Sequence, residues 1–109
     1  MPQTPEKAVH GVCMANTFLT RLKGWMLHRP APGEALLFDP CNAIHAWFML
    51  VAFDAVFLDH DNRIVRVIHS IRPWRGPFYV SGAVRVLELA DGRARELGLG
   101  VGDRLRFEP

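Results

Sequence analysis

The sequence lacks several features that would point to a particular class of protein. Its 109 residues include only two cysteines, Cys13 and Cys41, which are too few for a disulfide framework, so we expect reduced thiols. The longest uncharged apolar run, residues 43–53, is shorter than the roughly 20 residues that a membrane-spanning helix needs. We therefore expect no membrane span.

An excess of one charge is also missing. Lys and Arg number 13 against 11 Asp and Glu, a formal charge of +2. The basic residues are spread from Arg21 to Arg106, whereas nucleic-acid-binding domains concentrate theirs on one surface, so we expect no nucleic-acid partner. Residues 1–11 contain two prolines and a glutamate instead of an apolar leader, which predicts a cytoplasmic location. Export stays open if the start of the chain is trimmed.

The length predicts one domain with one hydrophobic core. Residues 1–8 read as a frayed polar tail and residues 9–109 as the domain. Short β-rich runs alternate with turns rich in Gly, Pro, Asn and Asp. The expected strands are 9–14, 35–38, 54–59, 63–69, 84–89 and 104–107, and 54–59 with 63–69 form a hairpin.

Two helices are expected beside these strands. Residues 18–26 carry apolar side chains at helical spacing after a possible N-cap at Asn16 or Thr17, and residues 93–97 form little more than one turn capped by Asp91. Strands and helices do not alternate, so a parallel doubly wound sheet is disfavoured. The pattern predicts a mainly β (α+β) fold: a small antiparallel sandwich or partly closed barrel with one packed helix and one short helix.

Several motifs occur together in an unbroken order. They are Gly24-Trp25-Met26-Leu27-His28-Arg29, the strand Gly33–Phe38, Phe48-Met49 followed by Asp54–Asp59, and finally Val86–Leu89 with Gly102-Asp103. Together they resemble DUF192, a domain family of bacteria and archaea. The resemblance implies a mostly β, jelly-roll-like domain and brings no established activity. Leu50 and Ala52 depart from the family pattern, which commonly has a basic residue and a proline there.

The stretch 40–59 holds the first candidate site residues. Cys41 and His45 lie four residues apart, about 13 Å along a strand, which is too far to share a zinc ion with bonds of about 2 Å. The same distance separates a thiol nucleophile from its base, unless a bulge brings them together. We therefore predict no metal site from this pair, although His45 with His69 on a neighbouring strand stays possible.

Three residues of this stretch are candidates for ligand contact. On a regular strand His45 and Trp47 share one face, a mixed polar and aromatic surface typical of pockets and also of cores. Asp54 heads an apolar strand and needs a partner if it is buried. It either caps a turn, pairs with Arg72 or Arg75, or faces the same pocket as His45.

The loop 72–79 is the best binding candidate by composition. Arg72 and Arg75 offer planar donors for carboxylates or phosphates, and Trp74 offers a stacking face. Such residues also cover cores and form dimer contacts.

From these residues we expect a non-enzymatic module that binds a small polar or anionic ligand, such as a sugar or carboxylate, without a metal or other cofactor. One alternative is a protein interaction or dimerisation domain, as a monomer or weak homodimer. The other is a thiol- or metal-dependent enzyme.

Overall fold

The computed structural model describes residues 6–14, 33–44 and 51–108. The helix expected over residues 18–26 lies outside these ranges. The described elements are β1 (Glu6–Val9), β2 (Val12–Met14), β3 (Ala35–Phe38), β4 (Ala43–Ile44), β5 (Phe53–Leu58), β6 (Ile64–Ile71), β7 (Phe78–Tyr79), β8 (Arg85–Ala90), α2 (Arg93–Glu96) and β9 (Arg104–Phe107).

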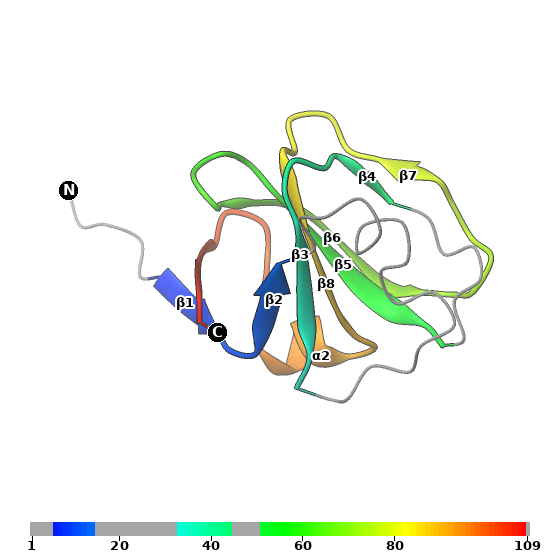
Figure 1. The fold of residues 1–109 in the computed structure, drawn as a ribbon, viewed down its shortest axis with the longest axis horizontal. Coiled ribbons are helices and arrows are strands. Elements are labelled where there is room, and N and C mark those ends of the chain that lie inside the picture. Colours follow the sequence, from blue (N-terminus) through cyan, green and yellow to red (C-terminus); the bar gives the residue numbers. More distant parts are fainter. Residues whose placement is uncertain (1–5, 15–32, 45–50, 109) are drawn as a thin grey trace.

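A five-stranded sheet in the order β2-β3-β8-β5-β6 forms the centre of the molecule (Figure 1). The pairs β3–β8, β8–β5 and β5–β6 are antiparallel, as expected, but β2 runs parallel to β3. Two smaller sheets flank it: β1 pairs with β9 in parallel and β4 pairs with β7 antiparallel. Short helix α2 follows β8 at one end of the central sheet.

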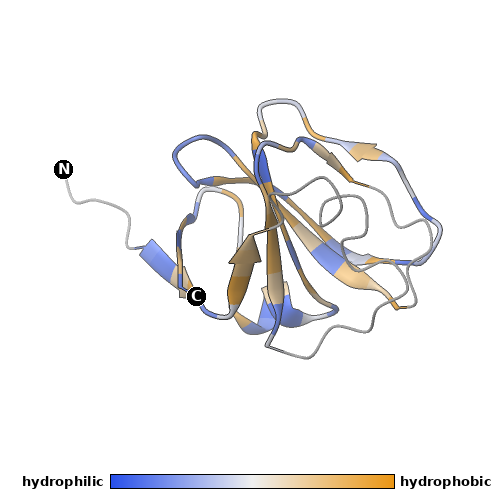
Figure 2. Cartoon of the chain, in the orientation of Figure 1, coloured by the Kyte–Doolittle hydropathy of each residue, from blue (hydrophilic) through white to orange (hydrophobic). Residues whose placement is uncertain are grey.

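β5 lies inside the sheet, and five of its six side chains are apolar, with Asp54 as the exception. All six of its residues are buried, and the strands around it are largely hydrophobic (Figure 2). Alternate residues project to opposite faces, so the core divides into two clusters. The face A cluster includes Leu36, Phe38, Phe53, Ala55, Phe57 and Val86; the face B cluster includes Leu37, Val56, Leu58, Leu87, Leu89 and Ala94.

The hairpin of β5 and β6 confirms the prediction for residues 54–69. Its turn is held by Asp59, whose Oδ1 accepts hydrogen bonds from the amides of Asp61 at 2.8 Å and Arg63 at 3.0 Å. Asn62 adopts the left-handed conformation with φ of 61°, which Asn tolerates better than most residues. Local side-chain chemistry therefore fixes this turn, which is why the sequence alone predicts it.

The structure corrects two expectations near the N-terminus. Residues 9–14 are not one strand, because the chain turns at Gly11, with φ of 73°, between β1 and β2. Residues 6–8, expected in a frayed tail, belong to β1. Lys7 fixes this strand, since its Nζ donates to Asp103 Oδ2 at 2.8 Å and to the Gly98 carbonyl.

The mainly β fold with a short helix near residues 93–97 is confirmed. The described strands do not close into a barrel. Among the residues that the structure describes, no helix has the length and apolar character to cross a membrane.

Candidate functional site

Asp54 is completely buried at the start of β5, where its carboxylate receives two backbone hydrogen bonds. Oδ1 accepts from the Ser70 amide and Oδ2 from the Ala94 amide, both at 2.9 Å. A buried carboxylate needs such partners, because losing its hydration is costly. Of the roles open from sequence, the contacts match turn capping and not pairing with Arg72 or Arg75. Asp54 therefore ties β5 to the end of β6 and to α2.

The same contact fixes the start of the arginine-containing loop. Ser70 adopts a left-handed conformation, with φ of 52°, next to a register shift between β5 and β6. Its amide is held by Asp54 and its hydroxyl donates to Asp91 Oδ1. Asp91 was expected to cap α2, but the N-cap residue is Gly92, and the carboxylate that accepts from an amide in the first turn of the helix is that of Asp54. Two aspartates thus position the backbone two residues before Arg72.

The loop 72–79 presents both of its arginines and two aromatic side chains to solvent. Arg72 and Arg75 are exposed and joined by a turn in which the Arg75 amide donates to the Arg72 carbonyl at 3.3 Å. Trp74, between them, is 60% exposed, and Tyr79 is 65% exposed. Trp74 has φ of 67°, a conformation that is uncommon and strained for a bulky residue. The loop therefore holds an indole outward against its backbone preference.

No carboxylate in the described part of the chain pairs with these two arginines. The ion pairs among the described residues involve Lys7, Arg85, Arg93 and Arg106, and His60 lies near Asp61. The guanidinium groups of Arg72 and Arg75 thus have no carboxylate partner among the described residues.

Glu88 is a second buried carboxyl, which the sequence analysis did not select. It is 5% exposed and lies in register with Leu36 on β3 and Ala55 on β5. Register partners project to the same face of a sheet, so the side chain lies among the face A cluster. Its Oε2 is buried without a hydrogen-bond partner.

Burial raises the pKa of Glu88 from the ordinary value of 4.5 to about 8, because a charged carboxylate loses its hydration there. The protonated form therefore predominates in the folded protein at neutral pH. The signal in the sequence was weak, since Glu88 occupies an apparently regular position in an alternating strand. Only the sheet order shows that both of its neighbours are core strands.

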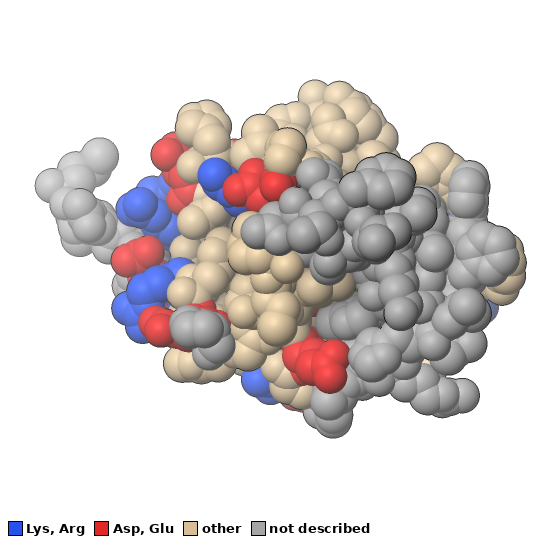
Figure 3. Space-filling view, viewed as in Figure 1, with Lys and Arg blue, Asp and Glu red and all other residues tan. Residues whose placement is uncertain are grey.

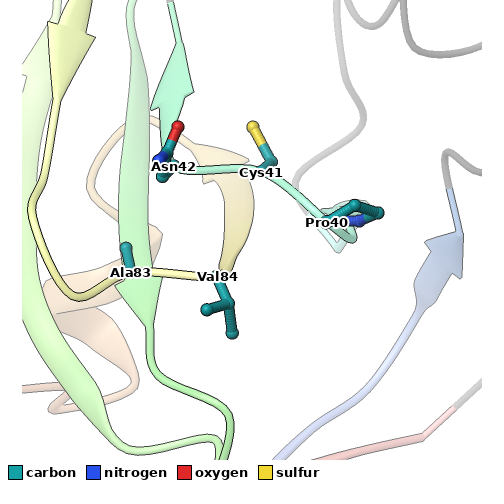
Figure 4. Close-up of a pocket in the computed structure, with 5 residues that line it drawn as sticks. All are labelled: Pro40, Cys41, Asn42, Ala83 and Val84. Carbon is teal, nitrogen blue, oxygen red and sulfur yellow. The ribbon is translucent and has the colours of Figure 1, made fainter.

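A hollow of about 250 Å³ lies beside Cys41, lined by Pro40, Cys41, Asn42, Ala83 and Val84 (Figure 4). The side chains of Cys41 and Asn42 point in the same direction there, whereas that of Val84 points away. Cys41 Sγ donates to the Ala43 carbonyl at 3.1 Å. Neither cysteine of the protein is in a disulfide.

Arg85 holds the segment that leads into this hollow. Its Nε lies 2.9 Å from Asp39 Oδ2, and its Nη1 donates to the Asp59 carbonyl and to Asn62 Oδ1 at 3.3 and 3.1 Å. The strand β8, the β5–β6 turn and the start of the hollow are thus joined by one guanidinium group.

Two of the predicted contact residues are not among the described residues. His45 and Trp47 lie outside the described residues, so the pocket expected around them stays a prediction. Within residues 6–14, 33–44 and 51–108, no three His, Cys, Asp or Glu side chains gather as metal ligands would. Of the six predicted contact residues, Arg72, Trp74 and Arg75 are exposed on one loop, and Asp54 is buried and bonded to the Ser70 amide just before that loop.

Fold and site together define a small, mainly β domain with a cationic and aromatic loop at the end of a buried sheet. Over residues 2–107 the chain matches the family described as DUF192, an uncharacterised ACR. A UPF0127 protein of Pyrococcus abyssi is 36% identical over 100 residues, covering 86% of this chain and 83% of that protein. The chain belongs to the DUF192 family.

Two solved structures have a similar fold. A protein of unknown function from Novosphingobium aromaticivorans superposes with a TM-score of 0.76 at 24% identity, covering 85% of this chain and 71% of that one. A Sinorhizobium meliloti protein, described as a proposed transcription regulator, has a TM-score of 0.73 at 27% identity, with coverages of 85% and 78%.

Proposed function

We propose that the protein is a non-catalytic binding module whose loop 72–79 recognises a small anionic ligand, such as an organic carboxylate or an acidic sugar. The observation that carries this proposal is the exposed Trp74, held in a left-handed conformation between two arginines that have no ion pair among the described residues. Guanidinium groups donate two parallel hydrogen bonds to a carboxylate, and an indole provides a flat apolar surface.

Two sets of contacts at the loop support its preorganisation. Its start is fixed by the buried Asp54 carboxylate through Ser70, and the turn from Arg72 to Arg75 is closed by a backbone hydrogen bond. A preorganised site loses less conformational entropy when a ligand binds. The two arginines therefore need little rearrangement of the backbone to reach one anion.

A protein interaction domain is the second candidate, and the exposed Tyr79 on the same loop supports it. Trp, Tyr and Arg are the residues that most often dominate protein interfaces. The two candidates differ in what they need: a small anion requires both arginines, whereas a protein partner also uses Tyr79.

Calorimetry against citrate, malonate, glucuronate, phosphate and neutral glucose tests the proposal. We expect one of the anions to bind and glucose not to bind. Replacing Arg72 and Arg75 together by Gln should weaken binding at least about tenfold, since one charge-assisted hydrogen bond contributes about 1.5–3 kcal/mol. Arg95→Gln is the matched control, because Arg95 is exposed on α2 and far along the chain from the loop.

Three outcomes would overturn the proposal. They are no heat with any anion, equal loss in the Arg95→Gln control, or a glucose signal as large as that of the anions. Calorimetry with a short DNA duplex is added, because the similar Sinorhizobium protein is described as a proposed transcription regulator. Binding of DNA that the double variant does not weaken would also contradict a site built on these two arginines.

A further inference from the structure

Strand β6 is the end strand of the central sheet and the longest strand in the described structure, at eight residues. Its neighbour β5 is buried throughout, but none of the six β6 residues 65–70 is buried. These residues extend for roughly 20 Å at the usual rise of a strand. β6 is therefore accessible along most of its length.

An end strand has hydrogen-bonding groups that its single neighbour does not use. About half of the N–H and C=O groups of β6 point away from β5, as in any edge strand. Among the described residues, only the first part of this edge is occupied: Ile64 donates to the Asp103 carbonyl and accepts from the Gly102 amide, both at 2.8 Å. The strand beyond it offers backbone groups to an added strand.

The charge along this edge has one sign. From Asn62 to Leu87 the sequence contains no Asp or Glu. A basic residue occurs at every third position from 63 to 75, namely Arg63, Arg66, His69, Arg72 and Arg75. Arg66 and His69 are exposed on β6 itself. Arg66 has no ion pair with any described carboxylate. Opposite charges across two paired strands stabilise the pairing, and like charges oppose it.

We propose that the outer edge of β6, with which no described strand pairs beyond Ile64, binds an extended acidic segment of a partner protein as an added β-strand. Backbone hydrogen bonds to residues 65–69 would supply affinity, and a glutamate or aspartate side chain opposite Arg66 would supply selectivity. This inference is independent of the small anion at loop 72–79, because it rests on the backbone of β6 and on Arg66.

A second copy of this chain fits the edge less well. Pairing two β6 strands antiparallel about His69 brings Arg66 of each copy opposite Arg72 of the other, and like charges opposite each other are destabilising. An exposed arginine on an edge strand also has a simpler role, which is to prevent such pairing. If Arg66 only prevents strand pairing, an acidic strand does not bind to β6.

The experiment uses a capped eight-residue peptide of alternating valine and glutamate, titrated into the full ¹⁵N-labelled chain. We expect amide signals of residues 65–69 to shift and their hydrogen exchange to slow. Arg66→Glu should reduce the affinity at least about tenfold, the effect of 1.4 kcal/mol. Arg95→Glu, an exposed arginine on α2, should leave it unchanged, and Arg66→Glu should still bind the small anion.

Two further peptides separate strand addition from charge attraction. A peptide N-methylated at alternate residues keeps its glutamates but loses half of its backbone donors, and we expect it not to bind. A valine–lysine peptide should not bind either. The inference is overturned if the N-methylated peptide binds equally well, if shifts lie outside β6, or if no acidic peptide binds. A mass of twice the monomer that increases in population in Arg66→Glu, which would place a glutamate opposite Arg72 of the other copy, would assign the edge to self-association instead.

Discussion

Asp54 and Glu88 are both buried carboxyl groups on central strands, but their surroundings differ. Asp54 receives two backbone hydrogen bonds on face B. Glu88 lies among the aliphatic and aromatic side chains of face A with Oε2 unpaired. Asp54 therefore stabilises a connection, whereas Glu88 costs stability when it ionises.

Replacing Asp54 by Asn should destabilise the fold by about 2–4 kcal/mol. An amide has one acceptor oxygen, so either the Ser70 or the Ala94 amide loses its partner and faces an NH₂ group. Chemical denaturation measures the loss. Asp61→Asn, at an exposed position in the β5–β6 turn, is the control and should change stability by less than about 0.5 kcal/mol. A similar small effect at Asp54 would contradict its assigned role.

Glu88 should make stability depend on pH. Its folded pKa of about 8 exceeds the ordinary value of 4.5, so the folded state holds its proton more tightly than the unfolded state does. Its contribution to stability is fully present below 4.5 and is lost as the pH rises toward and through about 8. One such group can change stability by at most about 1.4 kcal/mol per pH unit.

Denaturation of wild type and Glu88→Gln at pH 5, 6, 7 and 8 measures this dependence. The wild type should lose stability across the series relative to the variant, because Gln does not titrate. Glu96→Gln on the surface of α2 serves as a control and should follow the wild type. Parallel curves for wild type and Glu88→Gln would show that Glu88 ionises freely in the folded state.

Gly11 determines how β1 and β2 connect. A Cβ at this position would lie 2.5 Å from the Gly33 carbonyl oxygen, and φ is +73°. Gly11→Ala should therefore destabilise the protein by about 1–3 kcal/mol. Gly82→Ala has a similar φ of +87° with open space around the new Cβ, so thermal denaturation of both variants separates the clash from backbone strain. Equal losses would argue against the clash.

The elements differ in how far sequence alone determines them. The β5–β6 hairpin and β9 were predictable because Asp59, Asn62 and alternating side chains act locally. The break at Gly11 and the parallel pairing of β1 with β9 depend on residues almost a hundred positions apart. No short-range pattern reports such contacts.

The residues of the candidate site also differ in whether local sequence or distant contacts determine their surroundings. Composition identified Arg72, Trp74 and Arg75, since exposed loops of this kind are recognisable without a fold. The burial of Glu88 depends on β8 lying between β3 and β5, and the role of Asp54 depends on α2 approaching β5. The sequence of the strand by itself therefore does not report that Glu88 is buried.

Across the whole molecule, charge is unevenly distributed. Lys, Arg, Asp and Glu side chains intermingle over the end formed by β1 and β9 (Figure 3), where Lys7 pairs with Asp103 and Arg106 with Glu108. Donation from Lys7 lowers the pKa of Asp103 below its ordinary value, and the Gly100 amide adds to this. The segment from Asn62 to Leu87 contains five arginines and no acidic residue, and of these arginines Arg85 is paired with Asp39 from outside the segment.

The central claim is that Arg72 and Arg75 together bind a small anion. The most direct measurement follows the side-chain Nε–Hε signals of the arginines by NMR while the anion selected by calorimetry is added. The account predicts saturable shifts at Arg72 and Arg75, lost in Trp74→Ala if stacking contributes, and no shift at Arg95. Equal, unsaturable shifts at all exposed arginines, or no shift at Arg72 and Arg75, would contradict it.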